Sequence, residues 1–107
     1  MKEIITTNTF DKHYAKVSRY PKFSESIFRY CITKLANGER LEGKFKDHAL
    51  SKNSPKVYRG ARDFHLTSNI VIIYRMDADT LKLQDIGSHQ DLDLTENYKK
   101  FSKNLLK

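Results

Sequence analysis

Three histidines, His48, His65 and His89, lie in segments that also carry basic or small polar residues. The unperturbed pKa of histidine is closest to neutrality, so an imidazole can both accept and donate a proton at cellular pH. Cleavage of RNA through its 2′-hydroxyl needs a base for the 2′ proton, an acid for the 5′-oxygen leaving group and positive charge at the phosphate. Histidines among lysines and arginines could supply all of these without a metal or another cofactor.

Each of these histidines also has an ordinary structural explanation. His48 could cap a turn through Asp47, and His65 could be a half-buried strand residue with a satisfied ring. A loop histidine such as His89 is ordinarily structural or solvated. His13 lies among polar residues, and we expect no catalytic role for it. Because no two histidines have i, i+4 or H-x-H spacing and no cysteine pair accompanies them, zinc binding is less favoured than proton transfer.

The basic residues are concentrated in one stretch of the chain. Twenty lysines and arginines oppose thirteen aspartates and glutamates, which gives a formal charge of +7. Between residues 44 and 62 the sole acid is Asp47. A basic balance alone is compatible with weak polyanion binding, but the clustering favours a nucleic-acid partner. The residues predicted to bind RNA are Lys44, Lys46, Arg59, Arg62 and Asn69.

The cysteine content and the hydropathy pattern bear on the cellular compartment. With one cysteine, Cys31, no intramolecular disulfide can form. Cys31 lies among apolar residues at helical spacing, which predicts a buried, inert thiol. The longest apolar run, residues 70–74, is too short to cross a bilayer, and no signal peptide is evident. We therefore expect a soluble cytoplasmic protein.

The N-terminal part of the sequence predicts a short strand followed by two helices. Residues 3–7 combine isoleucines with threonines, which is typical of a strand. Thr9 is the expected cap of a first helix, whose apolar residues recur at i, i+4 and i+7. Ser24 is the expected cap of a second helix, and Asn37 with Gly38 is expected to end it.

After residue 43 the pattern predicts strands. Residues 57–66, 69–75 and 80–86 are the expected strands, and a polar turn joins the last two in a hairpin. The run 70–74 is apolar on both faces, so its strand should be central and covered on both sides. The order of elements predicts an α+β fold with the helices on one side of an antiparallel sheet.

Residues 93–107 predict an extra C-terminal helix. Residues 93–96 resemble a capping box, and apolar residues at helical spacing follow, interleaved with lysines. We expect the apolar stripe to pack on the sheet; a second interpretation has the lysines contact RNA or the ribosome. The length of 107 residues fits one domain, residues 1–107, with this helix as an extension.

The segment from residue 44 to 92 resembles the YafQ branch of the RelE/ParE superfamily of bacterial type II toxins. Any one of the matching motifs alone would be weak, but their order and spacing form a fairly specific signature. The motifs are Lys44-Phe-Lys-Asp-His48-Ala-Leu50, Tyr58-Arg59 with Arg62-Asp-Phe-His65, Ile70-Val-Ile-Ile-Tyr74, and Gly87-Ser-His89 followed by Leu92.

The resemblance implies a RelE-like microbial RNase fold, with two helices packed on a curved antiparallel sheet. It implies ribosome-dependent cleavage of mRNA and inhibition by a small antitoxin, DinJ- or RelB-like, with an acidic or partly disordered segment. By position, His48, His65 and His89 match the family's catalytic histidines, and His89 is the best candidate for the general acid.

Four positions depart from the pattern of YafQ-like toxins. Asn69 and Ile70 stand where an acidic residue and a tryptophan are usual; asparagine cannot act as a general base, and isoleucine cannot stack on a base. Asp85 replaces a customary basic residue and has the same charge as a phosphate. Asp93 replaces the customary phenylalanine after Leu92.

Three functions compete on the sequence. The leading hypothesis is an endoribonuclease toxin, an enzyme. The alternative is a non-cleaving ParE-like toxin that inhibits a target such as gyrase, which would not need three imidazoles. A non-catalytic RNA-binding module is third: it would tolerate loss of the histidines and lose binding with its lysines and arginines, with strong salt dependence.

Overall fold

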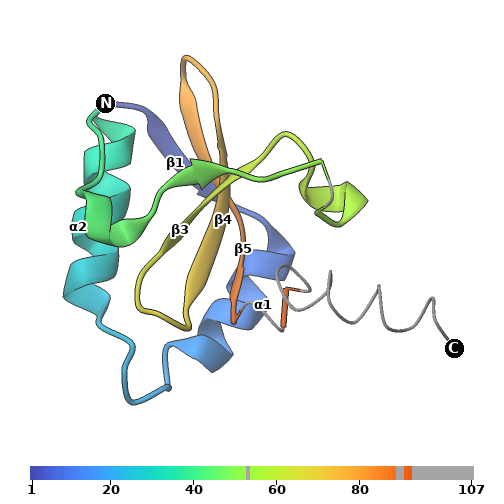
Figure 1. Ribbon diagram of the computed structural model, residues 1–107. Coiled ribbons are helices and arrows are strands. Elements are labelled where there is room, and N and C mark those ends of the chain that lie inside the picture. Colours follow the sequence, from blue (N-terminus) through green and yellow to red (C-terminus); the bar gives the residue numbers. More distant parts are fainter. Residues whose placement is uncertain (53, 89–90, 93–107) are drawn as a thin grey trace, which may run out of the picture.

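The computed structural model describes residues 1–52, 54–88 and 91–92, and these form one five-stranded sheet with two helices (Figure 1). The sheet order is β1-β5-β4-β3-β2. This arrangement confirms the predicted α+β class. In chain order the elements are β1 (Glu3–Thr6), α1 (Asn8–Val17), α2 (Glu25–Ala36), the 3₁₀ turn η1 (Gly43–Phe45), β2 (His48–Ala49), the 3₁₀ turn η2 (Lys56–Tyr58), β3 (Arg62–His65), β4 (Val71–Met76) and β5 (Thr80–Gly87).

The sheet is mixed, and this corrects the expectation of a wholly antiparallel one. Strands β2 to β5 pair antiparallel to one another, but β1 pairs parallel to β5, with Glu3 opposite Thr80. The physical reason lies in the connection. The chain leaves β1 through two helices rather than a tight hairpin, and such a long connection permits parallel pairing.

Helix α1 begins two residues earlier than the sequence suggested. The cap is Thr7 rather than Thr9: its Oγ1 accepts a hydrogen bond from Phe10 N at 2.9 Å. The same hydroxyl donates to the carbonyl of Gln84 at 2.7 Å. The cap therefore also ties the start of α1 to β5, a tertiary contact that local pattern cannot reveal.

Both ends of α2 form as predicted. Ser24 Oγ accepts from Ile27 N at 3.3 Å. At the other end Asn37 is the last capping residue, and Gly38 adopts φ +80. That left-handed conformation is inexpensive for glycine, and it lets Gly38 N donate to Leu35 O at 3.0 Å.

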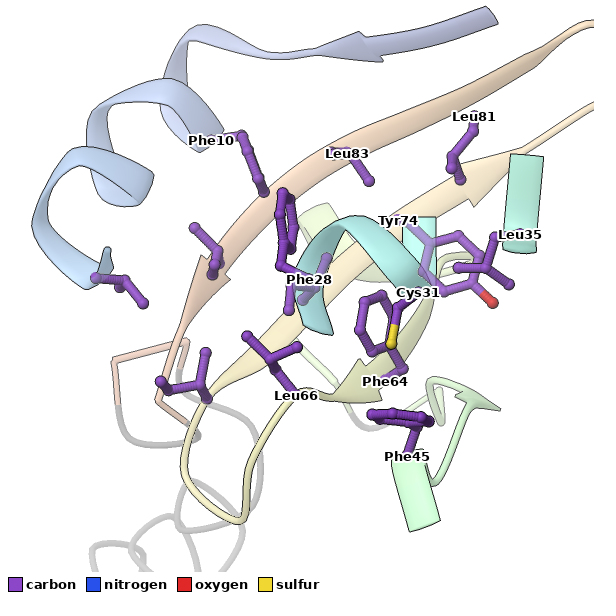
Figure 2. Close-up of a cluster of buried hydrophobic side chains, with 14 of the residues drawn as sticks. Phe10, Phe28, Cys31, Leu35, Phe45, Phe64, Leu66, Tyr74, Leu81 and Leu83 are labelled. Atoms are coloured by element: carbon purple, nitrogen blue, oxygen red, sulfur yellow. The ribbon is translucent and has the colours of Figure 1, made fainter. Parts of the chain in front are cut away.

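The main core lies between the two helices and one face of the sheet. Figure 2 shows Phe28, Cys31 and Leu35 of α2 among the side chains of Phe64 and Tyr74 from the strands. All five are buried. Cys31 is fully enclosed, and burial raises the pKa of its thiol to about 12. The prediction of a buried cysteine is confirmed.

A smaller core covers the other face of the sheet. Val71 and Ile73 of β4 pack there against Tyr58, Ala61 and Leu92. Figure 1 shows α2 and the yellow-green η2 segment on opposite sides of the strands. Strand β4 is central in the sheet order and buried on both faces, as its continuous apolar run predicts.

The strand expected over residues 57–66 is shorter. Residues Lys56–Tyr58 form η2, Gly60 turns the chain with φ +85, and β3 begins at Arg62. A proline before the segment and a residue with positive φ within it both disfavour a continuous ladder. The result is a folded segment that lies over the sheet and leaves four residues for β3.

A register shift between β4 and β5 changes which side chains of β5 face the smaller core. Ile73 pairs with Asp85 and Tyr74 with Leu83, so Gln84 is an extra residue on β5. Because side chains alternate along a strand, a regular β5 would direct Asp85 to the same face as Leu83, into the main core. The extra residue instead places Asp85 beside Ile73 on the face opposite the helices.

The predicted C-terminal helix over residues 93–107 lies outside the described residues, as does His89. Within the residues that the structure describes, no helix is long and apolar enough to span a membrane.

Candidate active site

A buried carboxylate, that of Asp63, lies beside two of the predicted catalytic histidines. Asp63 Oδ1 is 3.3 Å from His48 Nδ1 and 3.9 Å from His65 Nε2. The ring centroids of the two histidines are 6.1 Å apart. The backbone explains this grouping, because Asp63 and His65 are two residues apart on β3 and His48 on β2 pairs with Asp63. The structure thus brings His48 and His65 together around a residue that sequence reasoning did not select.

Asp63 is buried, and one of its carboxylate oxygens lacks a hydrogen bond within the described part of the chain. It is 1% exposed, and its Oδ1 has no hydrogen-bond partner among the described residues. Burial raises the pKa of its carboxyl to about 6, while the nearby His48 opposes that rise. Native proteins rarely leave a buried carboxylate oxygen unpaired, and perturbed carboxyls concentrate at functional sites. The Asp-x-His spacing on a strand was the available sequence signal.

The tautomer of His48 is defined by its surroundings. His48 Nδ1 lies 2.6 Å from the carbonyl oxygen of Lys46, which can only accept, so Nδ1 carries the proton in the neutral ring. Nε2 then has the free lone pair that a general base needs. The side chain is 53% exposed. Lys46 presents its carbonyl because its backbone adopts φ 51, a left-handed turn directly after η1.

Two of the predicted RNA-binding lysines border a groove next to His65. This groove, which we call the α2–β3 groove, has a volume of about 540 Å³. It lies between α2, η1 and the end of β3, and its lining includes Ile27, Tyr30, Lys44, Lys46, His65 and Ser68. Glu42 also lines the groove, which therefore gives His65 a concave neighbour with two lysines and one carboxylate.

Arg62 is not part of this group. It pairs with Tyr74 across the sheet and therefore points to the helix side. Its Nε donates to Asp47 Oδ1 and to the Tyr74 hydroxyl, both at 3.2 Å, and Tyr74 donates to the same Asp47 oxygen at 2.7 Å. Arg62 directly precedes Asp63 on β3. Because successive side chains of a strand point to opposite faces, the two side chains lie on different sides of the sheet.

Arg59 and Asn69 are exposed and lie in two different turns. Arg59 follows η2, and its carbonyl oxygen accepts from Arg75 at 2.9 Å. Asn69 lies in the β3–β4 turn, where its backbone N–H donates to Thr67 Oγ1 at 3.2 Å. Neither lines the α2–β3 groove. Ile70, at the position where the family has tryptophan, is buried in the main core.

A second histidine–carboxylate group forms on the same face of the sheet. Asp85 is buried; Oδ1 lies 2.7 Å from His13 Nδ1, and Oδ2 accepts from the Tyr58 hydroxyl at 2.6 Å. Oδ1 also accepts from Ile86 N at 2.8 Å. Asp85 is therefore enclosed by hydrogen bonds from the protein. His13, for which the sequence suggested no catalytic role, has a structural partner that local pattern does not show.

The position of His89 falls outside the described residues, but the end of β5 is defined. Gly87 pairs with Val71, which pairs in turn with His65, so the end of β5 lies two strands from His65, roughly 10 Å away. Among residues 1–52, 54–88 and 91–92, no group of three or more histidine, cysteine or carboxylate residues is arranged to hold a metal ion.

The fold is shared with solved structures of bacterial toxins. A copper-bound mutant toxin from Helicobacter pylori is 27% identical, with a TM-score of 0.76 over 86% of this chain and 99% of that one. A metal-bound toxin from the same organism is 28% identical, with a TM-score of 0.73 over 86% and 99%. In the E. coli DinJ–YafQ complex, the matched chain is 27% identical, with a TM-score of 0.69 over 86% and 98%. No curated protein gives a significant match.

These likenesses place the molecule among the small toxins with two helices on a mixed sheet. A family model described as "Bacterial toxin of type II toxin-antitoxin system, YafQ" matches residues 2–94. The chain belongs to this YafQ family of type II toxins, as the motifs between residues 44 and 92 suggested.

Proposed function

We propose that this toxin is a ribosome-dependent endoribonuclease that cleaves translating mRNA by histidine acid–base catalysis. One observation carries the proposal: a buried carboxylate oxygen of Asp63 that forms no hydrogen bond with the described residues lies close to both His48 and His65. A carboxylate beside an imidazole favours the protonated form of the ring, and a histidine that takes up a proton during a reaction needs that support.

The groups present can account for each proton in the reaction. His48 Nε2 takes the proton of the 2′-hydroxyl, and the 2′ oxygen attacks the phosphorus while the bond to the 5′ oxygen breaks. Asp63 stabilises the imidazolium that forms, through His48 Nδ1. Lys44 and Lys46 offset the charge that develops on the phosphate. As the family resemblance implies, His89 protonates the departing 5′ oxygen, with His65 supporting the phosphate between them.

The same proposal includes an antitoxin partner. YafQ of E. coli has been solved in complex with DinJ. With a net charge of +7, this chain would be complemented by an antitoxin segment that is acidic and folds across the histidine pair. Such a segment would neutralise the lysines and exclude RNA from the same surface.

The test is primer extension on a defined mRNA in a purified translation mixture, with and without ribosomes. We expect ribosome-dependent cuts from the wild type and their loss in His48→Ala, His65→Ala and His89→Ala. His13→Gln is the matched control, because His13 contacts Asp85 rather than Asp63. No cuts from folded wild-type protein would reject the nuclease and make inhibition of gyrase the next assay. Equal cutting by wild type and the three alanine variants would reject the catalytic assignment.

A further inference from the structure

The α2–β3 groove contains more than cationic side chains. Tyr30 and Ile27 of α2 line one wall and are 44% and 42% exposed. Large apolar side chains with this exposure usually contact a partner when they line a concave surface rather than stand alone. The exposed lysines Lys44 and Lys46 and the carboxylate of Glu42 also line the groove, so it combines an aromatic surface with charged side chains.

The Tyr30 ring is held in place before any ligand binds. Its hydroxyl donates to Glu42 Oε2. Lys34 Nζ lies 5.4 Å from the ring centroid and 3.6 Å from Glu42 Oε1. These contacts fix an exposed aromatic ring that would otherwise lose rotational freedom on binding, and such preorganisation reduces the entropy cost. They also engage the carboxylate of Glu42, so its charge is countered by Lys34.

The two lysines of the groove, unlike Tyr30, are not held by a carboxylate of the described residues. Lys44 Nζ lies 5.3 Å from the centroid of the Phe45 ring, and neither Lys44 nor Lys46 forms an ion pair with a described carboxylate. Both are exposed. A fixed aromatic ring beside unpaired cations is the combination by which proteins bind single-stranded nucleic acid, through base stacking and phosphate contacts.

His65 makes the groove continuous with the candidate active site. It lines the groove and is also 3.9 Å from Asp63 Oδ1 through its Nε2. Lys46 has a similar double position, because its side chain lines the groove while its carbonyl oxygen fixes His48. A ligand in the groove would therefore lie directly beside the reacting phosphate.

We propose that the α2–β3 groove binds the ribonucleotide adjoining the scissile phosphate, with its base on Tyr30 and Ile27 and its phosphate on Lys44 and Lys46. This proposal rests on the endoribonuclease function and adds a substrate subsite to it. The volume of about 540 Å³ is ample for one nucleotide. Because an aromatic face accepts any base, the stacking contact contributes affinity with little sequence preference.

The first experiment measures binding without cleavage. A fluorescent 2′-O-methyl RNA hexamer, which lacks the attacking hydroxyl, is titrated with each folded variant by anisotropy. We expect Tyr30→Leu to weaken binding roughly five- to hundredfold, and Tyr30→Phe to weaken it less because the ring remains. The double variant Lys44→Ala/Lys46→Ala should lower the magnitude of the slope of log affinity against log salt by about 0.7, because one phosphate is no longer neutralised.

The matched controls lie outside the groove. Lys12→Ala removes an exposed lysine of α1. Ile27→Ala removes an apolar side chain of the groove and should weaken binding, and Val57→Ala, which removes an exposed apolar side chain of η2, is its control. Both controls should bind the hexamer like the wild type. Failure of the wild type to bind, or equal binding by the Tyr30, Ile27 and lysine variants, would overturn the proposal. Unchanged RNA binding with lost antitoxin binding would assign the groove to the antitoxin and overturn it too.

The second experiment separates this subsite from the catalytic proposal. Single-turnover cleavage on ribosomes is followed as a function of toxin concentration. Tyr30→Leu should raise the half-saturating concentration and leave the maximal rate unchanged, whereas His48→Ala should lose the maximal rate. Cleavage with equal half-saturation in Tyr30→Leu and wild type overturns the subsite and leaves the nuclease intact. If the wild type cuts nothing, the nuclease proposal fails, and the hexamer titration alone decides whether the groove binds RNA.

Discussion

Two buried aspartates on one face of the sheet, Asp63 and Asp85, lie on either side of Ile73 in a cross-strand row, yet their surroundings differ. Asp85 accepts hydrogen bonds from Tyr58 and from its neighbour's backbone, and lies 2.7 Å from His13. Asp63 keeps an unpaired oxygen beside two histidines. The same residue types in the same sheet thus form two kinds of group. In the closed group, Asp85 with His13 and Tyr58, the carboxylate oxygens have hydrogen-bond partners. In the open group, Asp63 with His48 and His65, one carboxylate oxygen has none among the described residues.

Under the proposed function, this difference distinguishes a structural from a catalytic histidine–carboxylate pair. A satisfied network rigidifies a fold, and Asp85 connects α1, η2 and β5 through its partners. An unsatisfied carboxylate costs stability and is retained where a reaction uses it. Proximity of histidine to aspartate is therefore insufficient to identify an active site; the state of the carboxylate oxygens is the informative feature.

The largest expected effect is on cleavage activity. One histidine is removed from each group: His48 from the open group and His13 from the closed group. His48→Ala should lower ribosome-dependent cleavage on the order of a hundredfold or more, because a general base commonly contributes 10² to 10⁴ in rate. His13→Gln should leave the rate per folded molecule unchanged. Initial rates from primer extension at matched concentrations of folded protein test this contrast. Equal losses in both variants would remove the distinction between the groups.

The free energy of unfolding should depend more on Asp85 than on Asp63. Asp85→Ala leaves the Tyr58 hydroxyl and the Ile86 N–H buried without their acceptor, so we expect a loss of about 2–4 kcal/mol in the free energy of unfolding. Asp63→Asn should cause no comparable loss, since it removes a buried charge. Urea denaturation at pH 7.5 measures both. A larger loss for Asp63→Asn than for Asp85→Ala would contradict the comparison.

The pH dependence of stability should depend on Asp63. Its carboxyl pKa is raised to about 6 in the folded protein, above the unfolded value of 3.8, so between these values the folded state binds more protons. This contribution to the free energy of unfolding therefore decreases as the pH rises from 4 to 6 and is constant above. Relative to wild type, Asp63→Asn should gain about 1–2 kcal/mol over that range. A difference that is independent of pH would refute the raised pKa.

The smallest effect concerns one hydrogen bond in the closed group. Tyr58→Phe removes the hydroxyl that donates to Asp85 and should cost about 1 kcal/mol. Combined with Asp85→Ala, it should add much less, because the two residues contribute the same interaction. A double-mutant cycle by urea denaturation provides the measurement. Strict additivity would show that the contribution of the Tyr58 hydroxyl does not depend on Asp85.

Much of the fold follows from local pattern. The apolar run of β4 has no polar face, and this alone predicts a central strand. Ser24 and Gly38 mark the ends of α2 through capping chemistry that depends on neighbouring residues only. The parallel pairing of β1 was not predictable in this way. It depends on where a distant strand lies after two helices and most of the sheet have formed.

The site was predictable only in part. His48 and His65 were selected for their chemistry, and the structure brings them together, but Asp63 was passed over although it is two residues from His65 on one strand. Arg62 was assigned to RNA from its charge, and alternation directs it to the other face, where Tyr74 and Asp47 hold it. The extra residue Gln84, which moves Asp85 out of the main core, depends on pairing with β4 and has no signature in β5 itself.

Cys31 has a practical consequence for studying this toxin. Enclosed in the core with a thiol pKa of about 12, it has almost no thiolate at neutral pH, and thiolate is the reactive form. Because the chain has no other cysteine, we expect the folded natural protein to resist alkylating reagents. A cysteine introduced at an exposed position, such as Lys12, would carry a fluorophore or a crosslinker at a single known point. The orientation of the toxin on its target could then be mapped without first removing a core residue.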